Sequence, residues 1–177
     1  SSFFYILSLH VALPIYVGRH TEDKESELLH ILQRVDESGI VYTRNRKKTK
    51  EISQFLYRNH ITATFNLAGL NDETKDSRQK AWLKGEFRVM VATNVFGMGI
   101  DKPDVRVVIH ADVPDSPEAY FQEAGRAGRD GMKAYAVLLF CARDKITLKQ
   151  RVSDTFPEKS YIRKIYEDIN FYYQMAR

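Results

Sequence analysis

The sequence contains one cysteine, no long apolar run and no loop motif for holding phosphate groups. The single cysteine, Cys141, excludes a disulfide framework and a cysteine-rich zinc site within the chain. Because Cys141 lies in the apolar run AVLLFCA, the pattern favours a buried, unreactive thiol. No apolar stretch approaches the ~20 residues that a membrane span needs, and no G-x-x-x-x-G-K-S/T sequence is present. The chain therefore cannot hold and hydrolyse a nucleoside triphosphate by itself.

The composition is that of a soluble globular protein, with 44% apolar and 28% charged residues among 177. This length accommodates one domain, or one domain with fragments of others at its ends. Charge is unevenly distributed, although the net charge is only +4. Residues 39–60 hold six Lys or Arg against one Glu, whereas residues 101–130 hold four basic against seven acidic residues. The local excess of positive charge suggests contact with a polyanion; a solvated helix face is the alternative.

Residues 1–16, SSFFYILSLHVALPIY, have an apolar centre but follow neither a helical nor a strand period. They could pass for a signal peptide, yet they lack an initiator Met, a basic n-region and an A-x-A cleavage site. We therefore expect residues 1–16 to be a non-native or artefactual leader, foreign to the fold, and the domain to begin at residue 17.

Short apolar runs alternate with stretches of helical periodicity along the rest of the chain. The apolar runs predict strands within residues 39–43, 61–67, 88–93, 105–113 and 133–141. The helical patterns cover residues 24–35, 44–59, 71–85 and 116–124, with Asn71 near an N-cap and Gly85 at a C-terminal end. Because the strands are continuously apolar, this alternation indicates an α/β fold whose parallel sheet has helices on both faces.

Ligands bind at the carboxyl ends of the strands in such sheets. We therefore expect the polar loops 43–48, 68–72 and 93–103, and an arginine-rich loop one helix later, at one edge of the molecule. After residues 156–157, the tail SYIRKIYEDINFYYQMAR predicts an amphipathic helix. We expect the domain to cover residues 17–156 and a truncated helical segment to cover 157–177. Its aromatic residues could stack on nucleic-acid bases, but packing against this domain or a following one is the favoured interpretation.

The stretch YFQEAGRAGRDG, residues 120–131, places arginines on a glycine-rich loop directly after a predicted helix. Gly125, Gly128 and Gly131 recur every third residue, and Arg126 and Arg129 stand between them at the same spacing. Glycines let the backbone approach a ligand closely, and the arginine fork stays charged and matches phosphate oxygens. Two arginines at this spacing can therefore address two oxygens of one polyphosphate. A flexible turn that binds nothing is the alternative.

Two further loops follow predicted strands and suit phosphate groups. In VATNVFGMGIDKP, Thr93 ends a strand and Gly97 and Gly99 follow, so that a hydroxyl and backbone N–H groups meet there. A tight turn explains these glycines equally well. Asp101 can accept from a ribose hydroxyl or pair with a nearby arginine. The basic segment RNRKK, residues 44–48, opens a predicted helix, and helix N-termini attract anions.

From about Glu22 to Arg177 the chain resembles the second RecA-like domain of a RecQ-family DNA helicase, in helicase superfamily 2. Motif IV of that family is similar to GIVYTRNRKKTKEI, and the short motif after it to FNLAGL. Motif V is similar to VATNVFGMGIDKPDVRVVIH and motif VI to AYFQEAGRAGRDG. The wording GMGIDKP with QEAGRAGRDG separates RecQ helicases from RNA-directed relatives. The resemblance implies a RecA-like sheet and a motor of two such domains, with ATP in the cleft between them.

The resemblance implies nucleotide-related roles for motifs V and VI. By match to motif VI, Arg129 is expected to be the finger that reaches the γ-phosphate held by the N-terminal RecA-like domain. Arg126 is expected to support it, and Gln122 to lie near the nucleotide or to couple the nucleotide to DNA. By match to motif V, Asp101 and Gly99 are expected beside the nucleotide. ATP and Mg²⁺ are expected to be bound mainly by that other domain, and no metal ligand is assigned to this chain.

The resemblance also implies contacts with DNA. By match to motif IV, Asn45, Arg46 and Arg44 are expected on the DNA backbone, and by match to motif V, Thr93 and Asn94 on the tracking strand. The implied partners are a single-stranded tracking strand, a duplex junction and the N-terminal RecA-like domain of the same protein, with no membrane partner. The implied setting is DNA repair and recombination in the bacterial cytoplasm, at the nucleoid.

The sequence departs from the family pattern at two places. Asn66-Leu67 stands where the family usually has Tyr-His before Ala-Gly-Leu, which puts DNA coupling at that point in doubt. The phosphate-binding loop and the DExH box are also missing, and the letters DETK at residues 72–75 predict only a capping segment of a charged helix. The predicted function is therefore a fragment of an ATP-dependent 3′–5′ DNA helicase that supplies motifs IV, V and VI and is inactive alone. A stand-alone nucleic-acid-binding or regulatory module and an RNA-directed helicase are the alternatives.

Overall fold

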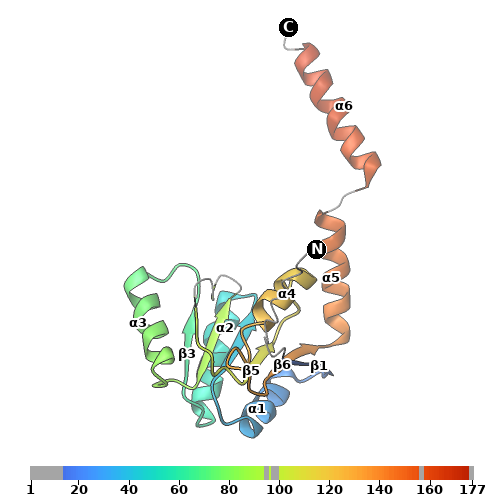
Figure 1. Cartoon of the computed structure of the whole chain (residues 1–177). Helices are drawn as coiled ribbons and strands as arrows, with labels where there is room; N and C mark the ends of the chain where they lie inside the picture. Colours follow the sequence, from blue (N-terminus) through green and yellow to red (C-terminus); the bar gives the residue numbers. More distant parts are fainter. Residues whose placement is uncertain (1–13, 94–95, 97–99, 156–157, 176–177) are drawn as a thin grey trace, which may run out of the picture. The chain divides into compact units, whose positions relative to one another are not determined.

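A computed structural model describes residues 14–93, 96, 100–155 and 158–175 of the chain (Figure 1). Its contacts divide the chain into two units between Cys141 and Ala142. The first unit contains the sheet described below. The second contains the helices α5 (Ala142–Thr155) and α6 (Lys159–Met175).

A six-stranded sheet in the order β1-β6-β5-β2-β4-β3 forms the centre of the first unit. The strands are β1 (Ile15–His20), β2 (Gly39–Thr43), β3 (Ala63–Asn66), β4 (Val89–Thr93), β5 (Val107–His110) and β6 (Tyr135–Phe140). All five neighbouring pairs are parallel. The helices between the strands are α1 (Lys24–Arg34), α2 (Arg46–Arg58), α3 (Asp72–Leu83) and α4 (Pro117–Ala124). The predicted α/β fold with a parallel sheet is therefore confirmed.

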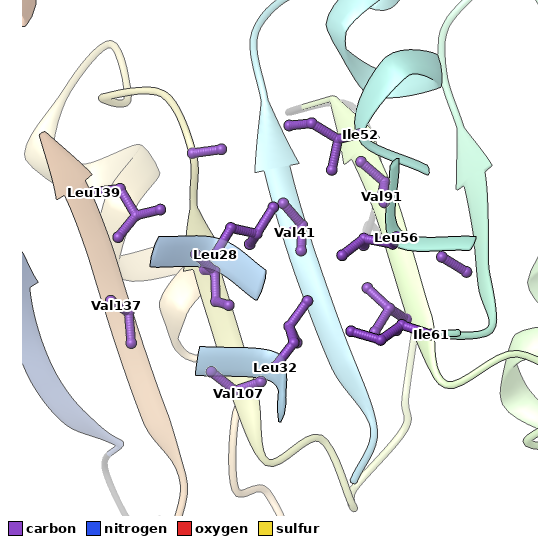
Figure 2. Packing of buried hydrophobic residues seen from close by; sticks show 14 residues of the cluster. Leu28, Leu32, Val41, Ile52, Leu56, Ile61, Val91, Val107, Val137 and Leu139 are labelled. Atoms are coloured by element: carbon purple, nitrogen blue, oxygen red, sulfur yellow. The ribbon is translucent and has the colours of Figure 1, made fainter. Parts of the chain in front are cut away.

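One face of the sheet packs against α1 and α2. Figure 2 shows Leu28 and Leu32 of α1 and Ile52 and Leu56 of α2 gathered around Val41 of β2, and all five side chains are buried. These helices bury one stripe each because their apolar residues recur at intervals of four.

The opposite face packs against α3 and the segments after β4 and α4. Trp82 of α3 is fully buried there, together with Ile40, Met90 and Phe96. Since successive side chains of a strand point to opposite faces, Val41 packs in the core on the face of α1 and α2, and Ile40 packs in the core on the opposite face. Burial on both faces explains why the central strands read as continuous apolar runs.

Side-chain caps set the helix starts. Asn71 accepts a hydrogen bond from the Thr74 backbone N–H at 2.9 Å and caps α3, as predicted. Ser116 caps α4 by accepting from the Ala119 backbone N–H at 3.2 Å. Gly85 follows the end of α3 with a φ of +79°, in the left-handed region where a residue without Cβ is favoured.

The expected domain boundaries at residues 16–17 and 156–157 stay predictions. Ile15 and Tyr16 were assigned to the leader, but they belong to β1, in register with Tyr135 and Ala136 of β6. Residues 1–13 of that leader lie outside the described residues. At the other end, α5 clusters with the second unit rather than with the sheet, because it has no buried residue. Cys141, expected to be buried, is only partly so.

The tail forms the predicted helix, α6, and its described apolar side chains are exposed. In the part of the chain that the structure describes, no helix combines the length and the apolar character that crossing a membrane requires.

Candidate functional site

The loops after β2, β4 and β5 begin side by side at the carboxyl edge of the sheet. Thr43 is in register with Thr93, and Tyr42 is in register with His110. The Thr43 hydroxyl lies 2.7 Å from the hydroxyl of Thr49, which ties the end of β2 to the first turn of α2. The predicted convergence of loops 43–48 and 93–103 at one edge therefore holds for their described first residues.

The backbone of the arginine-rich loop, residues 125–131, is anchored away from this edge, although Arg126 of the loop lies near Tyr42 at the end of β2. Gly128 donates its backbone N–H to the Val105 carbonyl at 2.9 Å, and Asp130 donates to the Pro103 carbonyl at 3.3 Å. Both acceptors precede β5, which begins at Val107. The eight residues of α4 extend about 12 Å, enough to carry the chain back along β5. The loop therefore lies near the amino end of that strand.

Arg129 is held by the segment that leads into β5. Its Nη1 donates to the Ile100 carbonyl at 3.0 Å and to Asp101 Oδ1 at 3.3 Å. The Arg129 side chain is 36% exposed and the Asp101 side chain 83% exposed, so water reaches the pair. The structure thus brings Asp101 and Arg129 together, one of the two roles foreseen for Asp101.

Arg126 contacts the phenol of Tyr42, at the end of β2. Its positive charge acts on the Tyr42 hydroxyl, and that hydroxyl donates to the Phe96 carbonyl at 3.2 Å. Burial raises the pKa of Tyr42 far above its ordinary value of 10.0, and the positive charge of Arg126 opposes that rise. Gln122 is exposed on α4. Gly99, the remaining residue assigned to the nucleotide, lies outside the described residues.

Acidic residues after β5 form ion pairs with part of the basic segment 44–48. The Arg44 guanidinium forms an ion pair with Asp115, and the Arg44 backbone N–H donates to Asp112 Oδ2 at 3.0 Å. Lys48 Nζ lies 2.5 Å from Asp112 Oδ1. Two cations of the predicted polyanion surface are therefore already paired with carboxylates of this chain.

Asn45 and Arg46 open α2 in different ways. The Asn45 side chain accepts from the Lys47 backbone N–H at 2.8 Å and caps the helix. Arg46 is exposed and lies over Gly69, where an added Cβ would come within 3.1 Å of its Nη1. Gly69 has a φ of +96°, so both the backbone conformation and the close approach favour glycine. Arg46 is thereby placed beside the AGL loop.

The residues that depart from the family pattern have structural partners. Asn66 is buried and its Nδ2 donates a hydrogen bond to the Lys75 carbonyl at 3.4 Å, and Leu67 is buried as well. Thr93 is also buried, and its hydroxyl has no hydrogen-bond partner among the described residues. Asn94 lies outside the described residues.

Sequence reasoning missed a buried pair next to the arginines. His110 Nε2 lies 2.8 Å from Glu123 Oε2, and both side chains are buried. The sequence offered one signal, a histidine that ends the apolar run VVIH. The inward orientation of Glu123 on α4 is seen only in the structure. Tyr42, Asp112 and Asp115 were missed as well, because their partners come from distant segments of the chain.

Among the described residues of the carboxyl edge, one small cavity is enclosed by side chains that follow β2 and β5. This cavity of about 20 Å³ lies between Tyr42, Arg44, His110 and Asp115, close to the volume of a single water molecule and too small for a nucleotide. Among the residues that the structure describes, no three His, Cys, Asp or Glu side chains gather as a metal site would require.

The pattern of the helicase conserved C-terminal domain family matches residues 23–131. The RecQ-like DNA helicase blm-1 of Caenorhabditis elegans is 46% identical over 117 residues, which cover 66% of this chain and 12% of that protein. The ATP-dependent DNA helicase RecQ of Bacillus subtilis is 49% identical over 108 residues, or 61% of this chain and 18% of that protein. The matched part is therefore less than a fifth of either relative's length.

A solved structure of the E. coli DEAD-box protein SrmB, bound to regulator of ribonuclease activity A, has the same architecture. Its TM-score is 0.69 at 29% identity, and the match covers 82% of this chain and 87% of that chain. The RecA-like fold inferred from the sequence is thereby confirmed.

Proposed function

Since the chain belongs to the helicase conserved C-terminal domain family and is of RecQ type, we propose that it is the second RecA-like domain of an ATP-dependent 3′–5′ DNA helicase. In this proposal it acts together with the N-terminal RecA-like domain of the same protein, which holds ATP and Mg²⁺. The observation that carries the proposal is a backbone-anchored loop that presents Arg129 to solvent.

The anchoring of the loop favours a role in positioning charge. Gly128 and Asp130 are bonded through their backbones to residues before β5, and the Asp130 carboxylate pairs with the Arg106 guanidinium. A side chain on a fixed loop loses little conformational freedom when it meets a ligand. Such preorganised cations stabilise the charge that develops on a transferred phosphoryl group.

The present partners of Arg129 are exchangeable. An exposed ion pair contributes only about 0–1 kcal/mol, and the Arg129–Asp101 pair is open to water on both sides. A phosphate carries more negative charge than a carboxylate and fits the same guanidinium donors. Asp101 is therefore the resting partner of Arg129 in this proposal, and the γ-phosphate of ATP takes its place in the assembled motor.

The residues present fit a polyphosphate, and Mg²⁺ is assigned to the other domain. Bound ATP supplies the phosphoryl group whose transfer to water drives movement along DNA. Arg129 meets its outer oxygens, while Arg126 stays against the Tyr42 hydroxyl and adds positive potential nearby. Gln122, exposed on α4, faces outward from the same helix.

The DNA surface is assigned to the carboxyl edge of the sheet. Arg46, which is exposed beside Gly69, meets the phosphate backbone. The N-terminus of α2, which Asn45 caps, meets it as well. Arg44 joins them when DNA displaces Asp115. The resemblance extends the proposal to DNA repair and recombination in the bacterial cytoplasm.

The test is an Arg129→Ala substitution in the full-length protein, with Arg58→Ala, an exposed arginine in the last turn of α2, as the control. We expect the rate of ATP hydrolysis to fall on the order of 10³-fold or more, while the Kd for single-stranded DNA changes less than about twofold. Retained turnover would contradict the finger assignment. Parallel loss of DNA binding would assign the loop to nucleic acid instead. Equal competition by RNA and DNA strands would favour the RNA-directed alternative.

A further inference from the structure

The most buried ionisable pair near the arginines joins the end of β5 to α4. His110 is 1% exposed and Glu123 is 7% exposed, and their side chains meet at 2.8 Å. Removing a carboxylate from water is unfavourable unless a donor meets it. The pair therefore fixes where α4 lies on the sheet, since neither side chain can move away without losing its hydrogen bond to the other.

The tautomer of His110 follows from its surroundings. No described atom hydrogen-bonds to its Nδ1. A proton on Nδ1 would be a buried donor without an acceptor, whereas a bare lone pair there is less unfavourable. We therefore assign the proton to Nε2, where it is donated to the Glu123 carboxylate.

Aromatic rings enclose His110 on two sides. The ring of Tyr42 stacks on it, with centroids 5.3 Å apart and planes inclined by 23°. The ring of Tyr120 meets it edge-on at 4.8 Å. Tyr42 belongs to β2 and Tyr120 to α4, so the imidazole is clamped between the sheet and the helix whose last turn leads into the arginine-rich loop.

Two contacts lead from this pair to Arg126. The Arg126 backbone N–H donates to the Glu123 carbonyl at 3.3 Å. The Arg126 guanidinium lies close enough to the Tyr42 hydroxyl for its charge to act on it, and this hydroxyl donates to the Phe96 carbonyl. Both the backbone and the head group of Arg126 are thus located by residues that contact His110.

We propose that Tyr42, His110 and Glu123 are positioning residues for Arg126, a buried frame that sets the distance of its guanidinium from the ATP phosphates. The inference rests on the proposed function, because Arg126 has work to do only in a nucleotide-hydrolysing motor. Tyr42 orients the Arg126 guanidinium, and Glu123 supplies a negative charge that balances the charge of Arg126 in a poorly solvated region. His110 contacts both Tyr42 and Glu123 and keeps their side chains in place.

The experiment uses conservative variants of the full-length protein. Tyr42→Phe keeps the ring stack on His110 and removes only the hydroxyl. Glu123→Gln keeps an acceptor for His110 Nε2 and removes the charge. Matched controls are Tyr135→Phe, at the amino end of β6, and Glu118→Gln, exposed in the first turn of α4.

We expect both test variants to lower the kcat of DNA-stimulated ATP hydrolysis about 10- to 100-fold, as for loss of a hydrogen bond to a charged group. The KM for ATP and the thermal unfolding midpoint should stay close to those of the controls. Unchanged kcat in both variants would overturn the proposal. A fall in the unfolding midpoint with unchanged kcat would overturn it too, because the frame would then be purely structural.

A double-mutant cycle separates positioning from general damage. If Tyr42 acts through Arg126, then Tyr42→Phe should have little further effect in an Arg126→Lys background. The same fold-reduction in both backgrounds would refute a shared path. Failure of the proposed function itself looks different, because the unaltered full-length protein would then show no DNA-stimulated ATP hydrolysis, and the frame would have no arginine to position.

Discussion

In the proposed function, acidic residues after β5 and the DNA backbone bind the same cations of the basic segment 44–48, so removing the acidic charge should strengthen DNA binding. Asp112 Oδ1 lies 2.5 Å from Lys48 Nζ, and Asp115 forms an ion pair with Arg44. The substitutions Asp112→Asn and Asp115→Asn keep the side-chain volume and an acceptor oxygen but remove both negative charges. Lys48 and Arg44 then become available to phosphates.

The size of the effect follows from counterion release. Each phosphate contact on a single strand contributes about −0.7 to the slope of log K against log salt. Two released cations should therefore steepen the slope by about 1.4, which corresponds to an affinity about 25-fold higher at ~0.1 M salt. The cost in stability should be small, since partly exposed ion pairs contribute about 0–1 kcal/mol each.

The assay is fluorescence anisotropy of a labelled single strand over a range of salt concentrations, using the 177-residue chain. Asp36→Asn combined with Glu37→Gln is the matched control, because it changes the net charge by the same two units and breaks the Arg88–Asp36 ion pair before β2, at the opposite edge. A double variant whose slope and affinity equal those of the control would refute the competition. An equal gain in the control would reduce the effect to net charge.

Three further substitutions test the fold and its acid stability. Asn45→Ala removes the oxygen that accepts a backbone N–H of α2 at 2.8 Å, and we expect the free energy of unfolding in urea to fall by about 1 kcal/mol; no loss would contradict the cap. Trp82→Ala empties a fully buried site and should lower stability by about 3–5 kcal/mol in the same assay, whereas a loss under 1 kcal/mol, roughly that of a surface site, would show a loosely packed core. Hydrogen bonding from the Met132 backbone and from Arg106 holds the pKa of Asp130 below its ordinary value of 3.8. The stability that Asp130 contributes is thus present above about pH 4 and lost as the pH falls through its lowered pKa. Asp130→Asn should therefore flatten the pH dependence of unfolding in that range, and an unchanged curve would refute the assignment.

The central strands could be predicted from sequence because burial on both faces leaves an unbroken apolar run. GIVYT matches β2 residue for residue. The strand β1 was missed because it is an edge strand of mostly exposed residues, IYVGRH, with no apolar period. Its hydrogen bonds come from β6, and no local pattern reveals a partner so far along the chain. The helix α5 was missed for a similar reason, since it has no buried residue to create a periodic signal.

The sequence shows where the basic residues cluster, but it does not show which groups they pair with. The basic excess in residues 39–60 suggested a polyanion, and the acidic excess in residues 101–130 was counted separately. The fold brings the two segments together through Arg44 and Asp115, and local counting cannot show this because ion pairing depends on which strands are neighbours. Likewise, His110 and Glu123 meet only because α4 runs back along the sheet.

The pairing of β1 with β6 affects how the first unit can fold during synthesis. Ile15 must wait for Tyr135, which follows roughly 120 residues later, on the order of ten seconds at the usual rates of translation. By then β2, β3, β4 and β5, which neighbour one another in the sheet, have already left the ribosome. Within this sheet, β1 is therefore synthesised first but is among the last strands to be bonded.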